Sequence, residues 1–226
     1  MQHLIIDADD TLWENNIYFE RAFDEFVDFL AHSTMSAREI RAILDEIEEA
    51  NARVHGYGSL NFGRNLRQCY EKLAERVVRD DELQVVMRFA ERILEQPLEI
   101  IEGVPGTLEY LAGRHELTLF TKGSLEEQKL KIDRSGLAAF FGHVAIVREK
   151  NAPAYRRLVE ERAMPLERSW MVGNSPKSDV NAALEAGLNA VFVPHAHTWV
   201  LEREEIRPGN GRLLTVERFV DLRAHF

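Results

Sequence analysis

The amino-acid sequence predicts an α/β protein: a doubly wound, Rossmann-like parallel sheet with an all-helical domain inserted into it. Two observations predict this fold class. Short apolar runs alternate with helical segments over residues 117–193, as in a parallel sheet with helices on both faces. Between the first apolar run and the second, the chain carries helical patterns instead. We therefore expect a core of residues 1–14 and 98–226 and a helical domain of residues 15–97.

Five apolar runs of strand length are expected to form the sheet. They are residues 4–6, 117–120, 144–147, 170–172 and 190–193. One helix between them is expected to start at a capping box of Ser124 and Glu127 and to end at Gly136. Another is expected to start at Ser178 and to end at Gly187. Sites in such sheets form at the carboxyl ends of the strands, so the residues there are the first candidates.

Four apolar stripes at helical spacing mark the inserted domain. Ser36 and Glu39 form a capping-box pattern before the second stripe. Such stripes are typical of the core of a helix bundle, and we prefer that interpretation to a cofactor site. The stripes are Phe19, Phe23, Phe26 and Leu30; Ile40, Ile43, Leu44 and Ile47; Leu66, Cys69, Tyr70, Leu73 and Val77; and Val86, Phe89, Ala90 and Ile93.

The charge of the chain limits its partners. The 28 Lys and Arg residues against 38 Asp and Glu residues give a formal net charge of -10. A field of this sign repels nucleic acids and anionic membrane surfaces, so neither is expected as a partner. A small anionic substrate binds such a protein only where a cation or a cluster of positive side chains reverses the field. The sequence does not indicate the oligomeric state.

The N-terminus and the cysteine content predict a cytoplasmic protein. The first ten residues lack a basic segment, and their short apolar run meets acidic residues at once, unlike a signal peptide or a membrane anchor. The single cysteine, Cys69, excludes an intramolecular disulfide, which fits a reducing compartment.

Three carboxylates follow the first apolar run, at Asp7, Asp9 and Asp10. Residues two apart in an extended strand end point the same way, so Asp7 and Asp9 would face one pocket while Asp10 faces away. Two carboxylates on one side suggest a nucleophile and a group that donates and accepts protons. The same spacing also occurs in turns and solvated loops, so residues elsewhere must decide.

Polar residues at the other strand ends fit a site for a phosphate and a cation. Thr121 ends a strand just before a helix, where a hydroxyl and backbone N–H groups are suited to phosphate. Lys150 supplies a positive charge at the head of the next helix. Asn174 and Asp179 lie on a turn whose oxygen atoms suit a hard cation.

Taken in order, these residues resemble the four signatures of the haloacid dehalogenase (HAD) superfamily. The matching segments are D-A-D-D-T-L at residues 7–12, the strand that ends in Thr121, Lys150, and G-N-S-P-K-S-D at residues 173–179. The resemblance is to the phosphatase-like branch, in which a helical cap is inserted after the first signature. It covers the core, whereas the helical domain matches only in position and helical character.

The resemblance implies a role for each matching residue. Asp7 would take the phosphoryl group as an aspartyl phosphate, and Asp9 would be the general acid and base. Thr121 and Lys150 would bind the phosphoryl oxygens. An acidic site also needs a cation to bind phosphate. The resemblance implies Mg²⁺, held by Asp7, the backbone carbonyl of Asp9, Asn174 and Asp179.

Asn174 departs from the family pattern, because many phosphatases of this family have Asp at this position. An amide oxygen coordinates Mg²⁺ without adding charge, so we expect a weaker metal site. The departure also motivates an alternative: a binding or regulatory protein that kept the fold and lost turnover.

These features together predict a Mg-dependent phosphatase, a phosphoric monoester hydrolase, that acts on a small phosphorylated metabolite. Tyr57 and Arg64 lie in a glycine-containing segment between two cap helices, and we take them as candidates for substrate binding. Lys122, next to Thr121, is a further candidate. The alternative interpretation is a plain turn with solvated Arg and Lys side chains.

Two other activities fit the same signatures. A haloacid dehalogenase would share the Asp7 nucleophile, but that branch lacks the second acid and uses no metal, so Asp9 argues against it. A phosphomutase would share both acids and the metal. His195 and His197 after the last strand suggest a transition-metal site with Asp179, but Mg²⁺ prefers oxygen ligands, and we leave both histidines out of the metal site.

Overall fold

The computed structural model of the protein describes residues 1–226, which divide into two compact units. One consists of Met1–Glu14 with Leu98–Phe226 and is called the α/β unit; the other, Asn15–Pro97, is called the helical unit. No helix in either unit combines the length and the apolar character needed to cross a bilayer.

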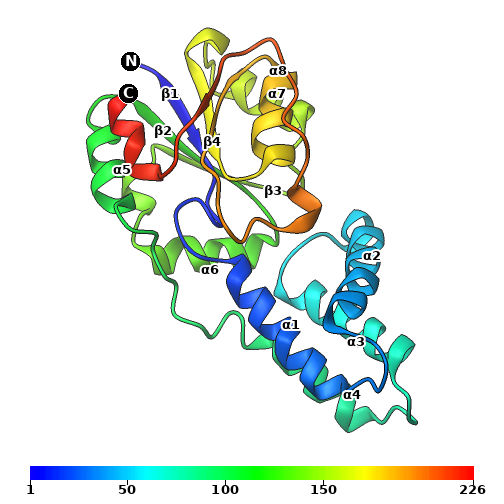
Figure 1. The fold of residues 1–226 in the computed structure, drawn as a ribbon. Coiled ribbons are helices and arrows are strands. Elements are labelled where there is room, and N and C mark those ends of the chain that lie inside the picture. Colours follow the sequence, from blue (N-terminus) through cyan, green and yellow to red (C-terminus); the bar gives the residue numbers. More distant parts are fainter. The chain divides into compact units, whose positions relative to one another are not determined.

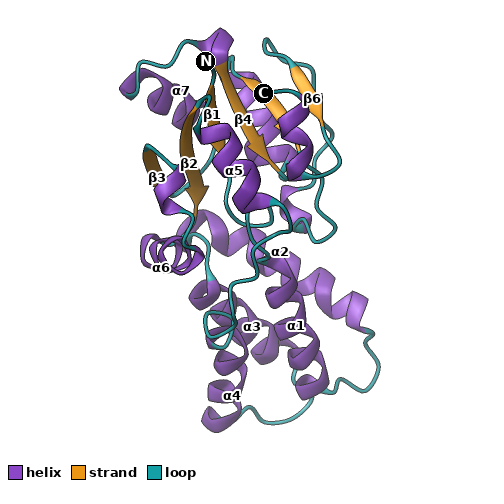
Figure 2. Ribbon diagram, turned by 90° about the vertical axis from the view of Figure 1, so that its left-hand side faces the viewer, coloured by secondary structure: helices purple, strands orange, loops and turns teal.

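The α/β unit is built on one sheet of six parallel strands in the order β3-β2-β1-β4-β5-β6. The central strand β1 lies between β2 and β4, and the sheet extends outward from it in both directions (Figures 1 and 2). The predicted doubly wound parallel sheet is confirmed, and each of the five expected runs forms a strand. The strands are β1 (His3–Ile6), β2 (Glu116–Lys122), β3 (His143–Val147), β4 (Ser169–Gly173), β5 (Asn189–Phe192) and β6 (Leu213–Thr215).

Helices pack on both faces of this sheet because its central strands are apolar on both sides. Leu4 and Ile6 of β1 belong to an apolar cluster with helix α5 (Val104–Ala112). Ile5 points the other way and belongs to a cluster with helices α7 (Ala152–Glu161) and α8 (Ala182–Ala186). The remaining helical segments are α6 (Leu125–Ser135), η1 (Ala138–Phe140), η2 (Leu166–Arg168), η3 (Pro176–Asn181), η4 (Val200–Glu202) and η5 (Phe219–Ala224).

The sheet has a sixth strand beyond the five expected ones. β6 pairs with β5 in parallel, and the closing segment is the 3₁₀ helix η5. Gly211 permits the approach of the chain to the sheet, since a Cβ at this position would lie 1.8 Å from the carbonyl oxygen of Leu188. A strand of three residues is too short to give a periodic signal in the sequence.

Two helix starts differ from the predicted capping patterns. At α6, the hydroxyl of Ser124 donates to Glu126 at 3.1 Å, so the expected capping box does not form. After β4, the cap is Ser175, whose hydroxyl oxygen accepts a hydrogen bond from the N–H of Ser178 at 2.9 Å. The segment that follows, η3, is a π-helical turn that leads into α8. Both helices end at the expected glycines.

The helical unit contains four helices whose apolar faces form one core. The predicted capping box of Ser36 and Glu39 is present at the start of α2. Val77 does not continue the stripe of α3, because that helix ends at Leu73 and the Val77 side chain is 87% exposed. The helices are α1 (Asn16–Leu30), α2 (Ala37–His55), α3 (Ser59–Leu73) and α4 (Asp80–Glu91).

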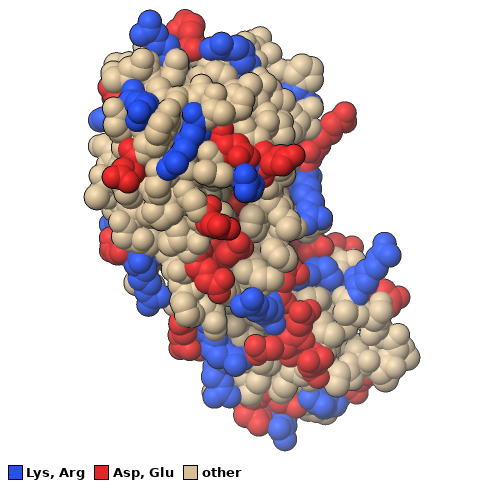
Figure 3. All heavy atoms as spheres, turned by 60° about the vertical axis from the view of Figure 1, so that its left-hand side comes forward, with Lys and Arg blue, Asp and Glu red and all other residues tan.

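Acidic and basic side chains are interspersed on the face of the molecule shown in Figure 3. Although the formal net charge is -10, positive and negative side chains do not form separate areas on this face. The face has no broad basic area of the kind that attracts a polyanion.

Candidate active site

Five predicted site residues lie at or just after the carboxyl ends of the neighbouring strands β1 to β4. Asp7 follows β1, and its N–H donates to the carbonyl of Val172 in β4 at 2.9 Å. Each of the five side chains is buried, which is unusual for carboxylates and a lysine unless they are paired. They are Asp7, Thr121, Lys150, Asn174 and Asp179.

Lys150 lies between two of the carboxylates. Its Nζ donates to Oδ1 of Asp7 and, at 2.8 Å, to Oδ1 of Asp179. The second oxygen of Asp179 accepts a hydrogen bond from the backbone N–H of Ser175 at 3.0 Å. The carboxylate of Asp179 is thus held by the chain at both oxygens, and it orients the lysine that contacts Asp7.

Two acids share one lysine in this cluster, which leaves one excess negative charge in a buried place. Burial and the nearby Asp179 carboxylate raise the pKa of Asp7 from its ordinary value of 3.8 to about 7, although Lys150 opposes them. Burial alone would lower the pKa of Lys150, but the carboxylates of Asp179 and Asp7 outweigh it and raise that pKa. A further positive charge in the site would therefore lower the pKa of Asp7 and favour its ionised form.

Thr11 joins Asp7 to Asn174. Its hydroxyl lies 3.1 Å from Oδ2 of Asp7 and 3.3 Å from Oδ1 of Asn174. The amide nitrogen of Asn174 donates to the hydroxyl of Thr198 at 3.2 Å, and that hydroxyl donates to the carbonyl of His195 at 3.0 Å. Because the Thr198 hydroxyl is occupied as a donor, it accepts from Asn174, and the amide oxygen of Asn174 is directed toward Thr11 and Asp7.

The donor atoms around Asp7 fit Mg²⁺. Carboxylate and amide oxygens are ligands that Mg²⁺ accepts, and the uncompensated buried charge is what a dication would neutralise. Oδ2 of Asp7 and Oδ1 of Asn174 both lie within hydrogen-bond distance of the Thr11 hydroxyl. Asp179 contributes its charge nearby, while its two oxygens contact Lys150 and Ser175.

Gly173 gives Asp179 the room it occupies, and Gly173→Ala is expected to lower stability. A Cβ at position 173 would lie 2.2 Å from Oδ2 of Asp179, so strand β4 or the carboxylate must shift. We expect a fall in Tm of about 5 °C, measured by calorimetry. Gly113→Ala is the control, since a Cβ at that position meets nothing closer than 3.8 Å. Wild-type values for Gly173→Ala would contradict the steric argument.

Asp9 has a different set of partners from Asp7. Its carboxylate accepts hydrogen bonds from Nε1 of Trp13 at 2.7 Å, Nε2 of Gln128 at 2.9 Å and Nζ of Lys131 at 2.8 Å. Burial raises the pKa of Asp9, but Lys131 and the other two donors outweigh burial, so that the pKa lies below its ordinary value. β1 ends at Ile6, so the strand geometry used to orient both acids toward one pocket does not extend to Asp9.

Asp10 does not lie in water. It is buried, has a left-handed backbone with φ 58°, and places Oδ1 3.7 Å from Nδ1 of His195. Nε2 of the same ring lies 3.2 Å from Oε2 of Glu14. Ligand-type atoms of these three residues lie within 4.8 Å of one another. Since the ring faces each carboxylate with a different nitrogen, the arrangement is an imidazole between two acids, and the suggested partner of His195, Asp179, is not among its contacts in this cluster.

Lys122, a predicted substrate-binding residue, is engaged by a residue that the sequence analysis missed. Its Nζ contacts Oε1 of Glu202 and lies 3.0 Å from Oγ of Ser178. The second oxygen of Glu202 accepts a hydrogen bond from the hydroxyl of Ser175. Glu202 is buried in η4, and its carboxylate ties the ends of β2 and β4 together. A single Glu in a segment without periodicity gave no signal of this role.

Tyr57 and Arg64, the other predicted substrate-binding residues, belong to the helical unit. Tyr57 precedes α3, and Arg64 on α3 donates from Nη1 to Oδ1 of Asn61 at 2.9 Å. Their contact with a substrate stays a prediction.

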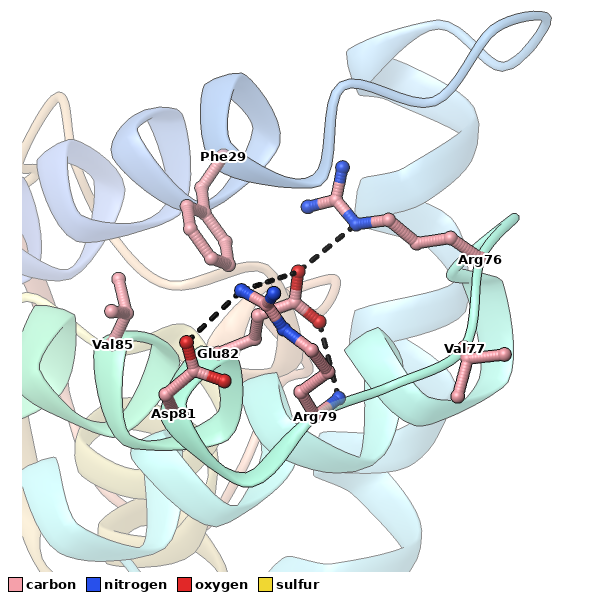
Figure 4. Close-up of a pocket in the computed structure, with 7 residues that line it drawn as sticks. All are labelled: Phe29, Arg76, Val77, Arg79, Asp81, Glu82 and Val85. Atoms are coloured by element: carbon pink, nitrogen blue, oxygen red, sulfur yellow. Dashed lines mark hydrogen bonds and ion pairs between the residues drawn. The ribbon is translucent and has the colours of Figure 1, made fainter.

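The helical unit also contains a pocket of about 670 Å³, drawn in Figure 4. Its two arginines are paired with acids: Nε of Arg76 donates to Glu82 at 3.1 Å, and Nη2 of Arg79 donates to Asp81 at 3.0 Å. These pairs leave the pocket without a concentrated positive charge. It is lined by Phe29, Arg76, Val77, Arg79, Asp81, Glu82 and Val85.

A doubly wound sheet with a buried acid-lysine cluster at its strand ends has the architecture of an α/β enzyme, since active sites of such sheets lie there. The family model described as haloacid dehalogenase-like hydrolase matches residues 1–187. The protein belongs to this family of HAD-like hydrolases and is an enzyme. The predicted family resemblance is confirmed. A comparison with curated proteins found no match.

Solved structures share the fold. A haloacid dehalogenase-like family hydrolase from Xanthomonas campestris is 28% identical, with a TM-score of 0.85, over 100% of this chain and 90% of that one. A predicted phosphoglycolate phosphatase from Haemophilus somnus is 16% identical with a TM-score of 0.68, and the L-2-haloacid dehalogenase from Xanthobacter autotrophicus is 15% identical with a TM-score of 0.66. The match to the predicted phosphatase covers 100% of this chain and 97% of that one. The match to the dehalogenase covers 99% of this chain and 97% of that one. Proteins with different reactions thus share this architecture.

Proposed function

We propose that the protein is a Mg-dependent phosphatase that hydrolyses a small phosphorylated metabolite through an aspartyl phosphate on Asp7. The observation that carries the proposal is the buried cluster in which Asp7 and Asp179 share Lys150 and leave an excess negative charge. A divalent cation bound by oxygen ligands would complete this cluster and make it attractive to a phosphate dianion. The presence of Asp9 favours this reaction over dehalogenation.

The chemistry requires Asp7 to act first. An oxygen of its carboxylate attacks phosphorus, the bond from phosphorus to the ester oxygen breaks, and the leaving oxygen takes the proton of the Asp9 carboxyl, which enters this step protonated. Water then attacks the phosphoryl group, gives a proton to Asp9, and releases phosphate and the free Asp7 carboxylate. Asp7, the carbonyl of Asp9 and Asn174 would hold Mg²⁺, with Asp179 nearby, and the bound ion would supply positive charge to the site.

Lys150 and Thr121 assist this sequence through their charge and hydrogen bonds. The Lys150 ammonium and the Thr121 hydroxyl bind the oxygens of the phosphoryl group. Esterification of Asp7 replaces its carboxylate charge with the charge of about −2 on the phosphoryl group. Lys150, which also keeps its contact with Asp179, and a bound cation would offset this charge.

We assign recognition of the leaving group to the helical unit, with Tyr57 and Arg64 as candidates. Tyr57→Phe and Arg64→Met are expected to change KM for a preferred metabolite more than they change the inhibition constant of inorganic phosphate. Equal changes for both would argue against a role in reading the leaving group.

A comparison of activities tests the proposed function. Wild type and Asp7→Asn are incubated with p-nitrophenyl phosphate, with Mg²⁺ or with EDTA, and separately with 2-chloropropionate. Phosphate release that needs both Asp7 and Mg²⁺ supports the phosphatase. Chloride release in EDTA supports a dehalogenase instead, and no release above Asp7→Asn in any arm supports a binding protein. A screen of phosphorylated metabolites would then identify the substrate.

Asn174→Asp is expected to lower the Mg²⁺ concentration that gives half-maximal activity by about tenfold, because it adds a charged ligand. The amide oxygen that it replaces already faces Thr11 and Asp7. The measurement is a Mg²⁺ titration of aryl phosphate hydrolysis. Asn210→Asp, at an exposed position, is the matched control. An unchanged titration for Asn174→Asp would contradict its role as a neutral ligand.

A further inference from the structure

Gln128 contacts two groups of the site that are far apart in the sequence. It lies on α6 and is 2% exposed. Its Nε2 lies 2.9 Å from Oδ2 of Asp9 and 3.0 Å from Oγ1 of Thr121. The proposed proton-transfer group and a proposed phosphoryl-binding group therefore share one amide as a hydrogen-bond donor.

The orientation of this amide is determined by its surroundings. Nε2 also lies 2.8 Å from the carbonyl oxygen of Lys122, so its two hydrogens serve three oxygens, and a backbone carbonyl only accepts hydrogen bonds. The nitrogen must therefore face this carbonyl. As a result, Oε1 of Gln128 is buried without a hydrogen-bond partner. A buried, unpaired amide oxygen lowers stability, so the arrangement is better explained by the groups that it orients.

Gly123 makes room for the Gln128 side chain. The backbone of Gly123 has φ 146°, and a Cβ there would meet Nε2 of Gln128 at 3.1 Å and its Cγ at 3.2 Å. The amide is thus seated against the backbone at the end of β2, where a side chain at position 123 would displace it.

The hydrogen bond to Thr121 affects what this hydroxyl offers to a ligand. Thr121 is 1% exposed, and its oxygen accepts from Gln128. An oxygen that accepts from one side directs its own hydrogen elsewhere, which leaves the hydroxyl to act as a donor. A donor is what an anionic phosphoryl oxygen requires.

Lys131 supports the same arrangement from the next turn of α6. Its Nζ lies 2.8 Å from both oxygens of Asp9, and residues three apart on a helix lie on one face. Together with Trp13, these residues hold both oxygens of the Asp9 carboxylate. Gln128 is the member of this set that also reaches Thr121.

We propose that Gln128 is a positioning residue that holds the Asp9 carboxylate and the Thr121 hydroxyl in fixed orientation relative to each other. This inference rests on the proposed function, because it assigns consequences to the roles of Asp9 and Thr121. Loss of the amide hydrogens impairs proton transfer to the leaving group and binding of the phosphoryl group at the same time.

The test uses Gln128→Met, which keeps the length of the side chain and removes its donors. Turnover is measured with phenyl phosphate, whose leaving group needs a proton, and with p-nitrophenyl phosphate, whose leaving group needs it less. We expect kcat to fall about tenfold more for phenyl phosphate. Inhibition by inorganic phosphate, which reports on Thr121, is expected to weaken about fivefold.

Double mutants separate positioning from a structural effect. In an Asp9→Asn background, Gln128→Met should no longer change the ratio between the two substrates, measured as the rate of leaving-group release in a single turnover. In a Thr121→Val background, it should no longer change phosphate inhibition. Lys129→Met, an exposed lysine on the same helix, is the control and should match wild type.

The outcomes separate the two proposals. A substrate ratio or a phosphate affinity of Gln128→Met equal to that of wild type overturns the role of Gln128, provided that wild type is active. If wild type itself hydrolyses neither aryl phosphate faster than Asp7→Asn, the proposed function fails and the inference falls with it.

Discussion

Replacing Lys150 by Met is expected to lower the free energy of unfolding by about 3–5 kcal/mol and to abolish turnover. Lys150 is 4% exposed, and its ammonium contacts the carboxylates of Asp7 and Asp179. Without this cation, two buried carboxylates lie close together with no opposite charge between them. Chemical denaturation at pH 8 in the presence of EDTA measures the effect, with aryl phosphate hydrolysis as the second readout.

Two further variants distinguish charge from packing. Adding Asp179→Asn to Lys150→Met removes one of the two unpaired charges and should recover part of the lost stability. Lys129→Met removes an exposed lysine and should leave stability unchanged. The loss in Lys150→Met should shrink as the pH falls, since a protonated carboxyl needs no cation. A Lys150→Met protein as stable as wild type at pH 8 would contradict the assigned role of the ammonium.

Asp7→Asn is expected to abolish turnover and, in EDTA, to stabilise the protein at pH 8. Burial and Asp179 raise the pKa of Asp7 from 3.8 to about 7. The folded protein therefore keeps the Asp7 proton up to about pH 7, whereas the unfolded chain loses it near 3.8. Wild-type stability accordingly falls as the pH rises between these values. Asn has no proton to lose and escapes this fall.

Thermal unfolding of both proteins across pH 4 to 8 measures this difference. We expect the stability of Asp7→Asn relative to wild type to increase by about 2–4 kcal/mol over that range. Adding Mg²⁺ at pH 8 should raise the Tm of wild type more than that of the variant, because ligand binding stabilises the folded state. A difference between the proteins that does not change with pH would contradict the charge excess in the cluster.

The sheet could be predicted because its central strands are buried on both faces. Continuous apolar runs such as 4–6 and 170–172 are sufficient to mark such strands, and the alternation with helices then fixes the parallel arrangement. β6 was not predicted, because it has only three residues and because the chain approaches the sheet there only in the absence of a side chain at Gly211. Val77 was placed wrongly because its spacing continued a helix that ends at Leu73.

The site could be predicted only as a set of residues at strand ends. Topology brings Asp7, Lys150 and Asp179 to one edge, and the structure places them in contact. The hydrogen-bond partners of each polar atom could not be predicted from the sequence. Gln128 and Glu202 look like ordinary residues of helical segments, and only the tertiary structure shows that they are buried against Asp9 and Lys122. The catalytic roles themselves stay predictions.

The most direct test of the central claim is to look for a phosphoryl group on Asp7. Wild-type protein is mixed with p-nitrophenyl phosphate and Mg²⁺, quenched in acid within the first turnover, and digested for mass spectrometry of the peptide that contains Asp7. We predict a phosphoryl group on Asp7 in wild type and its absence in Asp7→Asn. Phosphate release with no label on Asp7, or with the label on another residue, would contradict the mechanism.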